Sequence, residues 1–162
     1  MSCTANGGLP GGIPETIGNL ASLVTLRLDD CTIGGTIPNT IGDASSLVEL
    51  SLRRNLMVGT LPTSIGGLQE MDLFRVSGNE LSGPLPTEIG QLALLTELDL
   101  SGNTLTGELP TELLNLENLN ILDASLNAFR GSAEGFCGLD LDVFRTDCHQ
   151  EVVPNLASEV GE

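Results

Sequence analysis

Apolar residues return along this chain at a fixed spacing. Pairs of apolar positions flank one polar residue, as in Leu26-Arg27-Leu28, and the pair recurs every 24 residues in five consecutive units. Alternation with a period of two predicts a short strand with one buried face, and a fixed repeat stacks such strands about 4.8 Å apart into a parallel sheet. The two apolar columns are Leu26, Leu50, Phe74, Leu98 and Leu122, and Leu28, Leu52, Val76, Leu100 and Ala124.

Glycine and proline recur in the same register. The proline column is Pro14, Pro38, Pro62, Pro86 and Pro110, and the glycine column is Gly35, Gly59, Gly83, Gly107 and Gly131. These residues predict a tight bend from each strand onto an opposite, convex side, where segments such as residues 15–17 form short 3₁₀ turns. The expected fold is therefore an α/β solenoid with a concave parallel β-sheet, 3₁₀ turns on the convex side and little regular α-helix.

A polar column runs through this apolar pattern. It consists of Asn55, Asn79, Asn103 and Asn127, with Cys31 in the equivalent place of the first unit. An amide in an apolar interior must be hydrogen-bonded, and the nearest partners are backbone groups where each strand ends. We expect a structural role for all five residues, with Cys31 as a small buried thiol.

Residues 95–110, LTELDLSGNTLTGELP, carry all of these columns and resemble the repeating unit of the plant-type leucine-rich repeat family. The resemblance extends over roughly residues 9–148. It implies a right-handed superhelix and a recognition function without catalysis, as in receptor-like kinase ectodomains and polygalacturonase-inhibiting proteins. A fold alone does not establish function, so this implication is an expectation.

The repeats divide the chain into four parts. Residues 1–12 are a partial upstream repeat, 13–132 the five repeats, 133–150 a C-terminal cap and 151–162 an acidic flexible tail. In the cap, Val143, Thr146 and Cys148 take the places of Leu119, Leu122 and Ala124, and the segment resembles the closing segment of leucine-rich repeat proteins of diatoms. The first turn has no preceding cap, which leaves an apolar end that can support a dimer.

Four cysteines leave the redox state open. Cys137 and Cys148 are close enough in sequence to form a disulfide within the cap, and Cys3 and Cys31 are a less favoured second pair. A disulfide would place the protein outside the cell or in the ectodomain of a membrane protein, although the chain starts with no signal peptide. Four free thiols would favour a cytoplasmic scaffold instead.

The net charge is −16, with 22 acidic residues, six arginines and no lysine. Such a chain repels nucleic acids, and no apolar stretch is long enough for insertion into a membrane. Four of the arginines are expected at outward positions on the first three strands: Arg27, Arg53, Arg54 and Arg75. They are either a ladder of ion pairs with neighbouring acids or a surface that recognises an acidic ligand.

Farther along the concave face, the side chains of Glu97 and Asp99 are expected to project from the same face of one strand. Asp123 is expected beside Asp99 on the next strand. Paired carboxylates serve in glycosidases and in calcium sites, but an open face lacks the pocket that would shift their pKa values. We therefore expect no enzyme activity, no metal site and no cofactor. The seven charged residues together are the candidate contact surface for a protein, peptide or glycan.

Two alternatives to ligand recognition come from other classes. One is a surface-acting solenoid associated with ice or cell wall, suggested by threonines at Thr16, Thr40 and Thr63 on the convex side. The other is a polygalacturonase-inhibitor-like protein, for which no individual residue argues.

Overall fold

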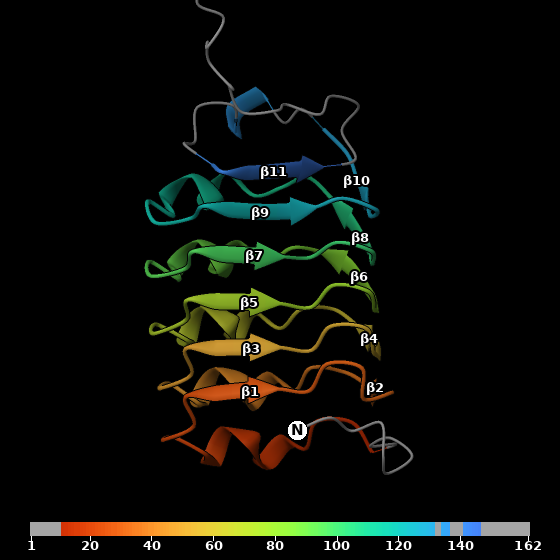
Figure 1. The fold of residues 1–162 in the computed structure, drawn as a ribbon, viewed down its shortest axis with the longest axis vertical. Helices are drawn as coiled ribbons and strands as arrows, with labels where there is room; N and C mark the ends of the chain where they lie inside the picture. Colours follow the sequence, from red (N-terminus) through yellow and green to blue (C-terminus); the bar gives the residue numbers. More distant parts are fainter. Residues whose placement is uncertain (1–10, 132–133, 137–140, 147–162) are drawn as a thin grey trace, which may run out of the picture.

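The computed structural model describes residues 11–131, 134–136 and 141–146. Within these residues the chain winds into a solenoid whose turns stack one on another (Figure 1). Six parallel strands form one side in the order of the sequence. They are β1 (Thr25–Arg27), β3 (Glu49–Ser51), β5 (Leu73–Arg75), β7 (Glu97–Asp99), β9 (Ile121–Ala124) and β11 (Val143–Thr146).

The opposite side consists of short 3₁₀ turns that begin directly after the prolines of the repeat. They are η2 (Glu15–Asn19), η3 (Asn39–Asp43), η4 (Thr63–Gly67), η5 (Thr87–Gln91) and η6 (Thr111–Asn115), followed by η7 (Glu134–Phe136). The described residues contain no regular α-helix. The 24-residue spacing of η2 to η6 makes Ser64 the equivalent of Thr16 and Thr40. The expected threonine row was therefore wrong at Thr63, which lies in the neighbouring column.

A second parallel sheet connects the two sides and was not expected from the sequence (Figure 1). It contains β2 (Gly34–Gly35), β4 (Leu56–Gly59), β6 (Glu80–Pro84), β8 (Thr104–Gly107) and β10 (Ala128–Phe129). Each of these strands precedes or contains the repeated glycine, whose φ is +81° in Gly59. A side chain there would place its Cβ 2.9 Å from Thr36, so the bend requires glycine.

The core is a continuous column of Leu, Ile and Met between the sheets and the turns. Leu50, Phe74, Leu98 and Leu122 meet in register on successive strands and are fully buried. Because each turn covers the apolar face of the next, stability is shared between neighbours along the array.

The last unit departs from the expected register. Phe144, not Thr146, pairs with Leu122, because β11 follows β9 after 22 residues instead of 24. The sixth strand therefore continues the sheet, and Phe144 takes the core position with its ring 6.1 Å from that of Phe136. Two fewer residues in the connection explain why a strict 24-residue comparison placed polar residues in the core.

Candidate functional site

The concave sheet carries two columns of side chains on its outer face, one on each side of the buried central position. The first column is Thr25, Glu49, Leu73, Glu97, Ile121 and Val143, and the second is Arg27, Ser51, Arg75, Asp99, Asp123 and Arg145. Because the strands are in register, residues of the two columns that belong to adjacent strands are diagonal neighbours. Seven of these twelve residues are charged.

Four charged residues form one chain of contacts across β1, β3, β5 and β7. The guanidinium of Arg27 donates to both carboxylate oxygens of Glu49, at 2.6 and 2.5 Å. Arg75 donates to Glu49 at 3.2 Å and to both oxygens of Glu97. Glu49 is only 5% exposed, so its charge is held between two arginines in a largely dry position.

Arg53 and Arg54 lie beyond the end of β3 instead of on a strand. Arg53 pairs with Asp29 at 3.1 Å, and Arg54 donates to both oxygens of Asp30 at 2.6 Å each. Arg54 has a φ of +53°, a left-handed bend that lets two consecutive arginines project outward. All four arginines of the candidate surface therefore have a carboxylate partner.

These contacts shift the pKa values of the groups involved. Hydrogen bonds to Glu49, Asp30 and Glu97 raise the pKa of Arg27, Arg54 and Arg75, respectively. The hydrogen bond from Arg54 lowers the pKa of Asp30. Burial acts to raise the pKa of Asp29, but hydrogen bonds from Ser51 and Arg53 outweigh it, so the net shift is downward.

The lowered pKa of Asp29 gives a testable pH dependence. A carboxylate whose pKa is lower in the folded than in the unfolded state stabilises the fold above the unfolded value of 3.8. That contribution is lost as pH falls from about 4 through the lowered folded-state value. We expect Asp29→Asn to destabilise the protein at pH 7, and this effect to shrink progressively as the pH falls below the unfolded value of 3.8. Urea unfolding of both proteins at each pH measures this, and a difference that persists undiminished at low pH would contradict it.

Asp99 and Asp123 are in register on β7 and β9, as the spacing predicts. The hydroxyls of Ser77 and Ser101 donate to Asp99 at 2.6 and 2.7 Å, and Ser125 donates to Asp123 at 2.5 Å. Asp123 also lies 3.3 Å from exposed Arg145. In the part of the chain that the structure describes, no arginine lies within 4 Å of Asp99. The two carboxylates thus leave this half of the concave face acidic.

Within the described ranges, no three His, Cys, Asp or Glu side chains come together in a group that could hold a metal ion. The same residues include no helix with the length and apolar character needed to cross a membrane.

The asparagine column ties successive turns together. The Asn79 side-chain oxygen accepts from the backbone N–H of Met57 at 3.0 Å, while its nitrogen donates to the carbonyls of Leu52 and Val76 at 2.9 Å each. Asn55, Asn103 and Asn127 make the equivalent contacts one repeat earlier or later. These bonds satisfy backbone groups that the bend would otherwise leave unpaired in the core.

Comparison with known proteins adds a family to this geometry. A family model described as Leucine Rich Repeat matches residues 22–44, 46–68 and 94–116. Among solved structures, the leucine-rich repeat ectodomain of the receptor kinase SOBIR1 from Arabidopsis thaliana is 32% identical, with a TM-score of 0.69. The match covers 75% of this chain and 68% of that one. The chain belongs to the plant-type leucine-rich repeat family.

Two longer leucine-rich repeat structures are also similar. The plant peptide hormone receptor RGFR1, solved in complex with RGF2, is 37% identical with a TM-score of 0.83, over 86% of this chain and 23% of that one. The Arabidopsis receptor kinase HAESA, solved with the peptide hormone IDA and the co-receptor SERK1, is 35% identical with a TM-score of 0.74. That match covers 76% of this chain and 21% of HAESA, so the chain spans about a fifth of both receptors. A comparison with curated proteins gave no match.

Within this leucine-rich repeat array, the first repeat differs in one covalent feature. Cys31 is 1% exposed, as expected of a buried structural cysteine, and it is disulfide-bonded, a possibility that the sequence left open as the less favoured one. Its backbone N–H still donates to the side-chain oxygen of Asn55 at 2.9 Å. The pair expected between Cys137 and Cys148 lies outside the described residues and stays a prediction.

Proposed function

We propose that this leucine-rich repeat domain is a non-enzymatic recognition module that binds an extended peptide on its concave face. The observation that carries the proposal is the open, in-register face across six strands, on which Leu73, Ile121 and Val143 lie beside charged positions. Such a face offers apolar and ionic contacts at regular intervals. The similar receptors RGFR1 and HAESA were solved with peptide hormones, which supports the same class of ligand here.

The composition of the face favours a peptide over a glycan. The whole sequence contains neither Trp nor Tyr, the side chains that combine a large flat apolar surface with a polar group. The contact surface in this proposal comprises the seven charged residues already named, Arg27, Arg53, Arg54, Arg75, Glu97, Asp99 and Asp123. Because its four arginines already have carboxylate partners, Asp99, which forms no ion pair within the described residues, is its strongest unmatched charge. Asp123 beside it is paired with the exposed Arg145 alone, so a peptide with basic side chains fits best.

The proposal includes action outside the cell, as part of a receptor-like protein or on its own. The disulfide at Cys31 supports an oxidising compartment, where such bonds form and persist. Dimerisation through the N-terminal end stays a prediction that is independent of the concave face.

Selection from a displayed library of random peptides tests the binding function. We expect peptides rich in Lys and Arg to be enriched, and the double variant Asp99→Asn with Asp123→Asn to weaken their binding at least tenfold, since each desolvated charge pair contributes about 1 kcal/mol or more. A matched control, Asp43→Asn with Glu117→Gln, removes the same charge from exposed convex positions and should leave affinity unchanged.

Two results would overturn the proposal. One is the absence of any enriched peptide with a protein whose unfolding transition is intact. The other is an equal loss of affinity in the concave variant and the convex control, which would indicate attraction to net charge instead of a binding face.

A further inference from the structure

Leu126 is the most exposed large apolar side chain in the described part of the chain, and it lies at the rim of the concave face. It is 75% exposed and comes two residues after the end of β9. All five residues of its column have a positive φ, between +53° and +67°. The column is Asp30, Arg54, Gly78, Gly102 and Leu126. The concave strands therefore end in the same left-handed bend.

This bend suits glycine and disfavours leucine, whose Cβ crowds the backbone there. Asp30 and Arg54 also adopt it, and their side chains pair with each other across the rim. Leu126 instead holds a bulky apolar side chain in an unfavourable conformation and leaves most of it in water. Backbone outliers of this kind collect at functional sites, so the position points to contact with another molecule.

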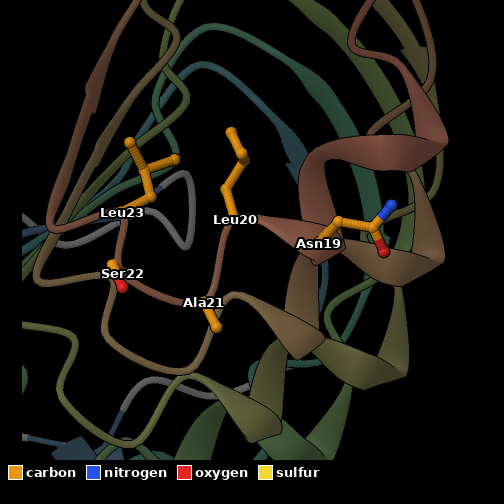
Figure 2. A pocket seen from close by; sticks show the side chains of 5 residues that line it. All are labelled: Asn19, Leu20, Ala21, Ser22 and Leu23. Carbon is orange, nitrogen blue, oxygen red and sulfur yellow. The ribbon is translucent and has the colours of Figure 1, made fainter.

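The exposure of Leu126 differs in origin from that of the other strongly exposed leucines. Leu20 is 50% exposed and lines a shallow depression with Leu23, and Figure 2 shows both side chains inside the open curve of the solenoid. Within the described residues this first turn has a neighbour on one side only, whereas the equivalent Leu68 is fully buried between two turns. Leu126 follows a strand that is flanked by β7 and β11. Its exposure therefore reflects its place on the rim.

The glycines of the column show where the Leu126 side chain points. A Cβ on Gly78 would lie 3.3 Å from the Cγ of Arg54, and a Cβ on Gly102 would lie 3.5 Å from the backbone nitrogen of Gly78. Side chains in this column are thus directed toward the preceding repeat. Leu126 is therefore directed over Gly102, which comes three residues after Asp99. The exposed leucine and the acidic half of the concave face share one area.

Three kinds of contact follow one another along β9 in this area. Ile121 is partly buried in the first column, Asp123 lies two residues farther on beside Asp99, and Leu126 comes three residues later. Alternate side chains of an extended peptide lie on one face, about 6.6 Å apart, which is also the spacing of Ile121 and Asp123 on their strand. Asp123 and Leu126 are at most about 10 Å apart, a distance that a long flexible Lys or Arg side chain can accommodate.

We propose that Ile121, Asp123 with Asp99, and Leu126 form a specificity subsite for a Lys or Arg with an apolar residue two positions away on each side. This inference rests on the proposed function and adds which peptides the face selects. Over the subsite the peptide backbone follows the direction of β9. Apolar contact with Leu126 excludes water from the ion pair beside it, which strengthens that pair.

Selection from the displayed peptide library with the wild type and with Leu126→Asn tests the subsite. Asparagine tolerates the left-handed bend, so this substitution removes the apolar surface without changing charge. With the wild type we expect basic residues flanked by apolar residues at both alternate positions. With Leu126→Asn the preference for a basic residue should remain, and one of the two apolar preferences should disappear.

Affinities for a synthetic peptide of the wild-type consensus make the test quantitative. Leu126→Asn should weaken binding about tenfold, because the leucine loses its apolar contact. Leu126→Met keeps an apolar side chain and should bind as the wild type does. Leu56→Thr should also leave affinity unchanged, since it removes a 53% exposed leucine from the second sheet at a position where the equivalent residues are threonines.

Stability separates a binding role of Leu126 from a structural one. The urea midpoint of Leu126→Asn should be at least that of the wild type, because the substitution relieves the bend. Enriched basic peptides without the alternate apolar residues, or apolar preferences that survive unchanged in Leu126→Asn, would overturn the subsite and leave recognition of basic peptides intact. If neither protein enriches any peptide, the proposed function itself fails, and the subsite with it.

Discussion

Asn79→Ala is expected to lower the free energy of unfolding by about 3 kcal/mol. The substitution removes the acceptor of the Met57 N–H in the core, and an unpaired buried donor costs about 1–3 kcal/mol. The missing amide also leaves a small cavity. The carbonyls of Leu52 and Val76 lose less, because each still accepts from the neighbouring asparagine, Asn55 or Asn103.

The position of Asn79 in the array adds a second expectation. Asn79 lies in the middle repeat, so its loss weakens the contact between the N-terminal and C-terminal halves of the solenoid. In a one-dimensional array, a weak central interface lets the two halves unfold separately. Equilibrium urea denaturation should therefore show a broader or two-step transition.

Asn118→Ala is the matched control for this prediction. Its side chain makes one hydrogen bond, to the carbonyl of Ala93 at 2.8 Å, on the exposed side of the molecule. Water can replace that bond, so the change in free energy should be small. Equal destabilisation by the two substitutions would show that the asparagine column has no special structural role.

The repeat length was enough to predict most of the architecture. Because five units have identical spacing, the columns of Leu98, Asn103 and Pro110 each point to one environment in the solenoid. The strand register, the 3₁₀ turns and the side on which Asp99 and Asp123 meet all follow from that spacing.

Features that break or cross the period could not be predicted in the same way. The register of β11 depends on a connection from β9 that is two residues shorter than in the other repeats. The signal for this shift was Phe144, an apolar aromatic residue two positions before the polar Thr146. The second sheet depends on backbone bonds near glycine, such as those of β4 and β6, which an apolar pattern does not record. The disulfide at Cys31 requires a position in space that sequence distance alone does not give.

The contacts of the candidate surface were predictable only in part. Outward positions follow from alternation, but the partner of each arginine does not. A signal did exist: Glu49 follows Arg27 by 22 residues and Glu97 follows Arg75 by 22, which places each pair diagonally across adjacent strands. By contrast, Arg53 and Arg54 pair with residues 24 positions earlier, because both partners lie beyond the strands in equivalent bends.

Glu49→Gln is expected to lower the free energy of unfolding by about 3 kcal/mol, through the charge network and not through the core. The side chain of Glu49 is only 7% exposed, and its carboxylate lies between Arg27 and Arg75. Removing its charge leaves Arg75, itself 19% exposed, with Glu97 alone, and breaking a buried pair by removing one partner typically costs 3–5 kcal/mol. Exposure of Arg27 to water places the expected value at the lower end of that range.

Asp30→Asn distinguishes burial from ion pairing as the cause. It also removes a carboxylate that accepts two hydrogen bonds from one arginine, but the Asp30 side chain is 47% exposed and that of Arg54 62%. Solvent and salt screen such a pair, so Asp30→Asn should leave the urea midpoint almost unchanged. Raising the salt concentration should have little influence on the Glu49→Gln effect, because dissolved ions cannot approach the buried Glu49 side chain closely enough to screen its charge. If the two substitutions destabilise the protein equally, the network is a set of surface pairs and Glu49 has no structural role. If only Glu49→Gln destabilises it, the first half of the concave face is held in shape by its own charges, and ligand binding there must preserve them.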